Sequence, residues 1–129
     1  MSLEPGLILE LASDFLEASG GNDAGTMIGF YAPDGTVWHN YDDKVIDPVA
    51  SARSLDWLDH TVPDLVGDDA VITTMRAGFV IRSVLTGTTA KGADVRIHTC
   101  VVVTLDPGAT ITRTDEYLDS AALAPLLSR

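Results

Sequence analysis

The chain has 129 residues, of which 46% are hydrophobic and 21% charged, a composition typical of one folded domain with its own core. Its 19 acidic residues outnumber its 8 basic ones, giving a net charge of −11 that argues against nucleic-acid and anionic-membrane partners. No apolar run is long enough to span a membrane and no secretory signal pattern is present, so we expect a single cytoplasmic domain over residues 1–129.

Helices are predicted in the first half of the chain. Leu7, Leu11 and Phe15 recur at helical spacing and predict an amphipathic helix over about residues 5–18, ended by Gly20-Gly21. A short second helix is expected from Asn22 or Asp23 towards Gly29. A third is predicted from Asp47-Pro48, where a capping side chain precedes proline, to about Val62.

Strands are predicted between and after these helices. Pro33-Asp34-Gly35 lies between two short segments, 30–32 and 36–40, which predicts a β-hairpin. After Gly67 we expect four further strands with glycine-bearing turns between them, and Asp119 should cap a short terminal helix. These strands cover about residues 69–76, 79–88, 94–105 and 110–118. Helices followed by a meander of strands indicate an α+β fold with a mainly antiparallel sheet.

Arginines on four strands predict which side chains point away from the core, because arginine seeks water or an interface. Alternation then turns the intervening residues inward, and Glu116 is the only ionisable group among them. The outward set is Arg76, Arg82, Arg96 and Arg113; the inward set is Val71, Thr73, Met75, Phe79, Ile81, Ser83, Leu85, Val95, Ile97, Thr99, Val101, Val103, Thr112, Thr114, Glu116 and Leu118.

Glu116 is the candidate catalytic acid or base. Desolvation should raise the pKa of a carboxyl that faces an apolar wall, which suits proton transfer near neutral pH. Two alternatives are a structural hydrogen bond to Tyr31, Trp38 or His39, and a position at the strand end where the carboxylate reaches solvent. His39 is the candidate second proton carrier, or else a hydrogen-bonded structural histidine.

Ligand contacts are predicted from residues near this inner face. Tyr31 could donate to a substrate oxygen or complete the core, and Trp57 on the third helix has packing as its default role. His98 shares the outward parity of Arg96 and is expected at the surface. The predicted ligand-binding residues are Tyr31, Trp38, Asn40, Trp57, Phe79 and Thr114.

No metal or cofactor is expected. The three histidines have no ligand spacing, and Asp42-Asp43 and Asp68-Asp69 fit solvated turns better than a cation loop. The single cysteine, Cys100, lies in the apolar segment Cys100-Val101-Val102-Val103, where an inert buried thiol is expected.

The end of the chain, Gly108-x-x-Ile111-x-x-x-x-Glu116-Tyr117-Leu118-Asp119, together with the preceding order of elements, resembles the SnoaL-like branch of the nuclear-transport-factor-2-like superfamily. The resemblance covers nearly the whole chain, including residues 31–40. It implies a cone-shaped α+β barrel whose cavity lies between sheet and helices, with an acid before the terminal aromatic facing that cavity. Glu116 matches that acid. The Arg-x-Asp pair of the superfamily's epoxide hydrolases is absent from Ile81-Arg82-Ser83-Val84, and the tyrosine and second acid of its ketosteroid isomerases have no match.

Two functions are compatible with these features. One is a cofactor-independent isomerase, cyclase or hydratase in which Glu116 shuttles a proton on a hydrophobic small molecule. The other is a non-catalytic ligand-binding or dimerisation module of the same fold. The resemblance also implies pairing through the outer sheet face, and a mixed surface there predicts a homodimer: Arg82, Arg96, Arg113, Val80, Val84, Val102 and Tyr117.

Overall fold

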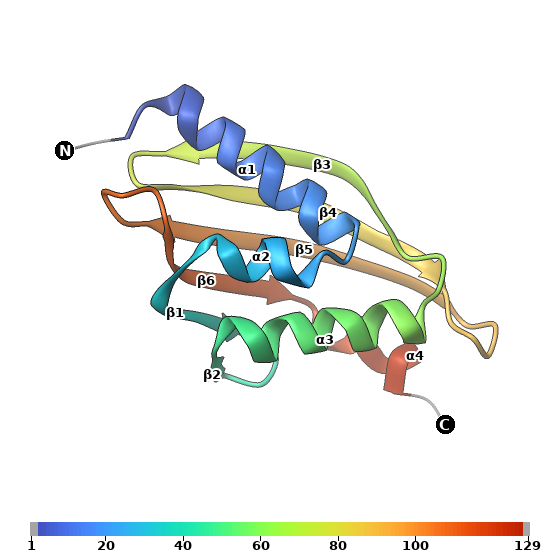
Figure 1. Cartoon of the computed structure of the whole chain (residues 1–129). Helices are drawn as coiled ribbons and strands as arrows, with labels where there is room; N and C mark the ends of the chain where they lie inside the picture. The colour runs from blue at the N-terminus through green and yellow to red at the C-terminus, as the bar shows by residue number, and fades with distance from the viewer. Residues whose placement is uncertain (1–2, 128–129) are drawn as a thin grey trace.

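The computed structural model describes residues 3–127, in which helices cover one face of a six-stranded sheet (Figure 1). The strand order is β2-β1-β6-β5-β4-β3, antiparallel except for the β1–β6 pair. The helical elements are α1 (Pro5–Gly20), α2 (Ala24–Gly29), α3 (Pro48–Thr61), the 3-10 helix η1 (Ser120–Leu123) and α4 (Ala124–Leu127). The strands are β1 (Tyr31–His39), β2 (Lys44–Ile46), β3 (Val66–Met75), β4 (Gly78–Thr88), β5 (Asp94–Leu105) and β6 (Ile111–Leu118). The predicted α+β fold with a mainly antiparallel sheet is confirmed.

Three aspartates begin three of the helical segments. The Asp23 side chain accepts from the backbone N–H of Thr26 at the start of α2, and Asp47 accepts from Ala50 at the start of α3. Asp119 caps η1 in the same way. These contacts satisfy backbone donors that have no partner inside the helix, so the predicted positions of all three starts are confirmed.

The predicted hairpin around Pro33-Asp34-Gly35 is wrong. These residues lie inside β1, which continues to His39 and pairs with β6 on one side and β2 on the other. The β1–β6 register is irregular between Tyr31 and Thr36, so the turn-forming residues produce a bulge instead of a reversal. A Cβ on Gly35 would lie 2.9 Å from the Tyr31 ring and 3.0 Å from the Ile111 carbonyl oxygen, which explains the glycine.

The inward parity is confirmed for β4 and β5 but is wrong for β3. Arg76 belongs to the turn between β3 and β4, so it does not report the orientation of a strand. Ile72 pairs with Ile81 and packs against the core, whereas Val71 and Met75, predicted inward, are exposed. On β6, a register shift against the end of β5 buries Ile111 in place of Thr112; beyond it Thr114 is buried as predicted.

Two separate clusters of apolar side chains form the core. The first packs α1 against one end of the sheet, and the second packs the α3 and α4 region against the other end. The first consists of Ile8, Ala12, Phe15, Phe79, Ile81, Val103, Leu105 and Ile111; the second of Val62, Val95, Ile97 and Leu126. The inner sheet face between the clusters is only partly covered.

Gly78 provides a test of the close contact between β4 and β5. An added Cβ would lie 1.9 Å from the carbonyl oxygen of Val103, which is backbone and cannot move without disturbing the sheet. We expect Gly78→Ala to lower the free energy of unfolding by about 1–3 kcal/mol or more, as overpacking does. Gly29→Ala is the control, since nothing lies within 4 Å of its Cβ position. Urea unfolding of both variants measures the difference, and equal midpoints would contradict the packing described.

Candidate functional site

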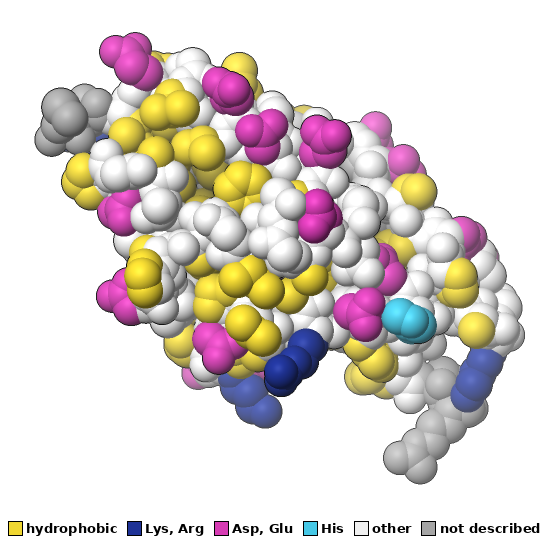
Figure 2. Space-filling model, viewed as in Figure 1, with side chains coloured by type: hydrophobic (Ala, Val, Ile, Leu, Met, Phe, Trp, Pro, Cys, Tyr) yellow, Lys and Arg dark blue, Asp and Glu magenta, His cyan; other side chains and the backbone are white. Residues whose placement is uncertain are grey.

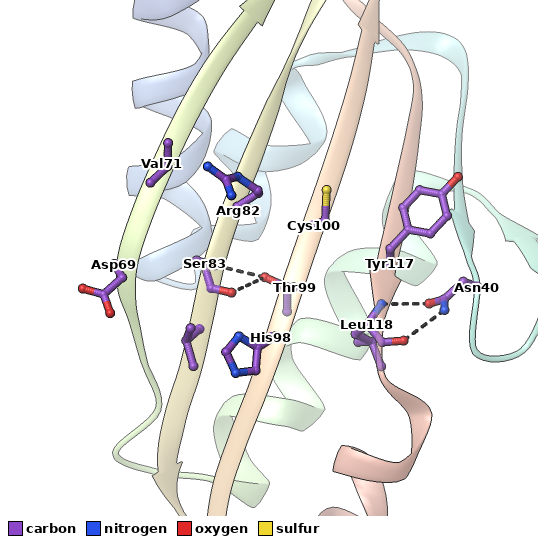
Figure 3. A pocket seen from close by; sticks show the side chains of 11 residues that line it. Asn40, Asp69, Val71, Arg82, Ser83, His98, Thr99, Cys100, Tyr117 and Leu118 are labelled. Atoms are coloured by element: carbon purple, nitrogen blue, oxygen red, sulfur yellow. Dashed lines mark hydrogen bonds between the residues drawn. The ribbon is translucent and has the colours of Figure 1, made fainter.

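Polar side chains occupy the inner sheet face between the two core clusters. Ser83, Thr99 and Glu116 come from β4, β5 and β6, and each is partly exposed. Inward residues are buried at both ends of β5 and at one end of β4 and of β6. The Ser83 and Thr99 hydroxyls share a hydrogen bond of 3.0 Å (Figure 3). These three residues form a partly covered strip, the inner strip, that we consider as a site.

The parallel pairing of β1 with β6 places His39 opposite Glu116. The distance from His39 Nε2 to Glu116 Oε2 is 3.5 Å. Asn40 continues the pairing beyond the end of β1, since its backbone N–H donates to the Glu116 carbonyl. The Asn40 amide also donates to the Leu118 carbonyl and accepts from the Leu118 N–H, both at 2.9 Å (Figure 3). Asn40 therefore holds the two strand ends in register.

Glu116 lies in an environment that favours its protonated form. Burial raises the pKa of its carboxyl; the His39 ring opposes this rise and the Asp42 carboxylate adds to it. The side chain nevertheless keeps 33% of its surface accessible. A carboxyl that is largely desolvated and still reachable from solvent is suited to exchanging a proton with a bound molecule.

The His39 side chain is only 4% exposed and is enclosed on several sides. The Tyr41 ring stacks on it, with ring centroids 4.8 Å apart and an interplanar angle of 12°. Its Nδ1 lies 3.5 Å from Asp42 Oδ1. The sequence prediction missed Asp42, which it assigned to a solvated turn. The available signal was its spacing of three residues after a strand-end histidine.

Tyr31 and Thr114 are joined by a hydrogen bond of 2.7 Å between their hydroxyls. Burial raises the pKa of the Tyr31 hydroxyl to about 12, and the nearby Glu116 charge adds to the rise. Tyr31 therefore stays neutral, with a hydroxyl that can donate a hydrogen bond. Thr114 has no exposed surface, so its direct contact with a ligand would require the core to open.

Three other predicted ligand contacts lie apart from Glu116. Trp38 points to the outer sheet face, where its ring packs edge-on against Tyr117 at 5.3 Å and its Nε1–H donates to Asp43. Trp57 is 50% exposed on α3. Phe79 is fully buried against Phe15, so a ligand could reach it only if the core opened. Their ligand-binding roles, like that of Asn40, remain predictions.

The outer sheet face carries an open hollow of about 430 Å³ (Figure 3). Cys100 lies in it between Arg82 and Tyr117 and is partly exposed, so the expected burial of this thiol is wrong. His98 is exposed there, as its parity predicts. The lining residues are Asn40, Asp69, Val71, Arg82, Ser83, Val84, His98, Thr99, Cys100, Tyr117 and Leu118.

Comparison with known proteins identifies the fold. No protein-family model matches the chain, and no curated protein matches it. Among solved structures, a protein of Xanthomonas campestris provisionally named a polyketide cyclase has a TM-score of 0.80 and 18% identity, covering 96% of this chain and 98% of its own. An NTF2-like protein of Burkholderia xenovorans has a TM-score of 0.78 at 16% identity, with coverages of 97% and 98%.

A provisional SnoaL-like polyketide cyclase of Shewanella putrefaciens, with 16% identity, reaches a TM-score of 0.76 over 94% of this chain and 85% of its own. The chain has the SnoaL-like, nuclear-transport-factor-2-like fold. At identities this low, the similarity establishes the fold of the protein, and its chemistry has to be argued from its own residues. No helix within residues 3–127 is long and apolar enough to cross a membrane. In the same residues, no group of three or more His, Cys, Asp or Glu side chains is placed to hold a metal ion.

The raised pKa of Glu116 predicts how stability should depend on pH. Because the folded state holds this proton more tightly than the unfolded state, its contribution is present at low pH and is lost as pH rises through the folded pKa. Glu116→Gln should therefore gain stability relative to the native protein as pH increases, by about 1.4 kcal/mol for each pKa unit of the rise. Urea unfolding across the acid-to-neutral range measures it. Glu10→Gln, on the exposed side of α1, is the control. A constant difference between native and Glu116→Gln proteins would contradict the assignment.

Proposed function

We propose that the inner strip between the two core clusters binds a hydrophobic small molecule, and that Glu116 and His39 move a proton on it. The reaction class is isomerisation, cyclisation or hydration, with acid and base supplied by the protein. The observation that carries the proposal is a partly exposed carboxyl of raised pKa, 3.5 Å from a nearly buried imidazole.

The chemistry follows from the protonation states of the groups. An ionised Glu116 accepts a proton from a carbon beside a carbonyl group, and the resulting acid returns it to another carbon or to oxygen. Charge develops on the substrate oxygen during the first step. Tyr31, neutral because its pKa is about 12, can donate a hydrogen bond to that oxygen. Apolar walls on both sides of the strip would hold the carbon skeleton.

The structural neighbours are compatible with this class of chemistry. Several are provisionally named polyketide cyclases, and AclR of Streptomyces galilaeus is provisionally named a hydroxylase. One fold therefore accompanies several named activities, and the proposal relies on Glu116 and its surroundings instead of on the names. A cytoplasmic location remains a prediction.

A second candidate function is a binding or dimerisation module that carries out no reaction. The full burial of Phe79 and Thr114 favours this second function, because both predicted ligand contacts are already packed inside the protein. Tyr31 is likewise already bonded to Thr114. In this case the inner strip binds a molecule without changing it.

Deuterium exchange distinguishes the two functions. Ketones with one to three fused rings, such as 2-tetralone, are incubated with the protein in D₂O and loss of the C–H signal beside the carbonyl is followed by NMR. We expect the native protein to accelerate exchange and Glu116→Gln to lower that rate at least about 100-fold, since it cannot carry the proton. Glu10→Gln should match the native protein. Saturable binding without exchange by the native protein would favour the binding module.

We also propose that two copies of the chain pair through the outer sheet face. Acidic side chains are scattered over the helix-covered face (Figure 2), whereas the outer face presents arginines among apolar groups. Tyr117 is 44% exposed there, and Arg82 and Arg96 are exposed beside the partly buried Val84 and Val102. Such a mixed surface suits a self-complementary interface.

Light scattering at micromolar concentration tests this pairing. We expect twice the chain mass of 13.7 kDa for the native protein and a single chain mass for Val102→Glu, which puts a charge in the centre of the outer face. Val49→Glu, at an exposed apolar position on α3, is the matched control and should remain paired. A native mass of 13.7 kDa would overturn the pairing.

A further inference from the structure

We propose that Asp42 is a positioning residue that holds His39 in the tautomer carrying its proton on Nδ1, so that Nε2 faces Glu116 as a proton acceptor. The tautomer assignment rests on the distances around the ring and on the different surroundings of the two carboxyl groups. Its catalytic consequence rests on the proposed function, and the experiment below separates the two.

Carboxyl groups approach both nitrogens of the His39 ring. Asp42 Oδ1 lies 3.5 Å from Nδ1, and Glu116 Oε2 lies 3.5 Å from Nε2. The Nδ1 atom is buried and has no hydrogen-bond partner within the described part of the chain, which leaves it facing the Asp42 carboxylate at 3.5 Å. A neutral imidazole has one donor nitrogen and one acceptor nitrogen. The ring therefore directs an N–H towards one of the two carboxyl groups and a lone pair towards the other.

The surroundings of the two carboxyl groups differ in a way that selects one tautomer. Asp42 is 32% exposed and its Oδ1 accepts the backbone N–H of Lys44 at 3.0 Å, an arrangement that suits a charged carboxylate. Burial favours the protonated form of Glu116. The Asp42 carboxyl beside Nδ1 favours N–H on that atom, and the burial that favours the protonated carboxyl of Glu116 also favours an acceptor at Nε2. One tautomer satisfies both preferences.

The turn that carries Asp42 follows His39 directly in the chain. The Asp43 N–H donates to the His39 carbonyl at 2.9 Å, which closes the turn directly after β1. Tyr41 stacks on the imidazole and limits its rotation. The neighbouring carboxylate, Asp43, accepts from Trp38 Nε1–H. Asp42 is therefore the carboxylate of this turn that faces the histidine.

This arrangement provides a route by which Glu116 can exchange its proton with solvent. Protonated Glu116 transfers its proton to Nε2, the ring becomes an imidazolium, and the Nδ1 proton passes to Asp42, which exchanges with water. One proton leaves Glu116 and one reaches solvent, which leaves Glu116 ionised and the ring protonated on Nε2. The reverse transfer, from water through Asp42 to Nδ1 and from Nε2 to Glu116, returns one proton to the carboxylate and restores the starting tautomer. The orienting part played by Asp42 is that of a carboxylate that fixes a catalytic imidazole.

Long-range ¹H–¹⁵N spectra of ¹⁵N-histidine-labelled protein report the tautomer directly. At about pH 8, above the ordinary histidine pKa, we expect His39 to be protonated on Nδ1, with His60 and His98 as internal references. In Asp42→Ala, which removes the acceptor, the Nδ1–H form should fall from the majority to a minority. Asp43→Asn, in the same turn, should leave the spectrum of His39 unchanged, and Glu116→Gln should keep the Nδ1–H form.

A native ring protonated on Nε2, or on both nitrogens, would overturn the proposal, as would an Nδ1–H population that follows Glu116 instead of Asp42. Where ketone exchange is observed, Asp42→Ala should lower kcat about 10-fold or more with little change in KM, because Asp42 does not touch the substrate. A protein with the Nδ1–H tautomer and no exchange would overturn the proposed function and leave the role of Asp42 intact.

Discussion

The parallel pairing of β1 with β6 is the constraint on which the rest of the site depends. It joins segments about 80 residues apart in the chain and inserts β1 beside the last strand instead of at the end of a local hairpin. His39 reaches Glu116 only because this pairing continues to the end of β1. Asn40 then extends it with three hydrogen bonds, one from its backbone and two from its side chain. A shift of one residue would turn His39 to the opposite face of the sheet.

The core is divided into two clusters, and the inner sheet face between them is only partly covered. Large apolar side chains close both ends of the inner sheet face, and hydroxyl and carboxyl groups occupy the middle. Leaving these inner positions only partly covered forgoes some burial of apolar surface, as expected of a region kept for binding. The SnoaL-like fold thus supplies rigid strands for the reactive groups, which holds their spacing more firmly than loops would.

The negative charge of the protein disfavours a further ionised carboxylate in the inner strip. In a chain of net charge −11, a further buried carboxylate is costly, and both burial and Asp42 raise the pKa of Glu116. His39 is the group that offsets this cost. The surroundings of Glu116, chiefly His39 and Asp42, therefore determine how readily Glu116 holds its proton and where that proton can go.

The sequence alone was sufficient for elements whose signals are local. Aspartate caps and the Asp-Pro pair placed the helix starts, and alternation placed β4, β5 and the far half of β6. Glu116 was found as the single ionisable residue of the inward set because the arginines predicted the parity of the strands and every other inward residue was apolar or carried a small hydroxyl group. These features depend on residues close in the chain, where spacing predicts geometry.

Tertiary structure decided the rest. Pro33-Asp34-Gly35 forms a bulge because β6 offers a partner that outweighs the local turn preference, and β3 reversed its predicted parity because Arg76 belongs to a turn. Asp42 acquired a role only when the turn after β1 folded back towards His39. Pairings between distant strands and the approach of a turn to a buried ring depend on the three-dimensional path of the chain, which local spacing does not encode.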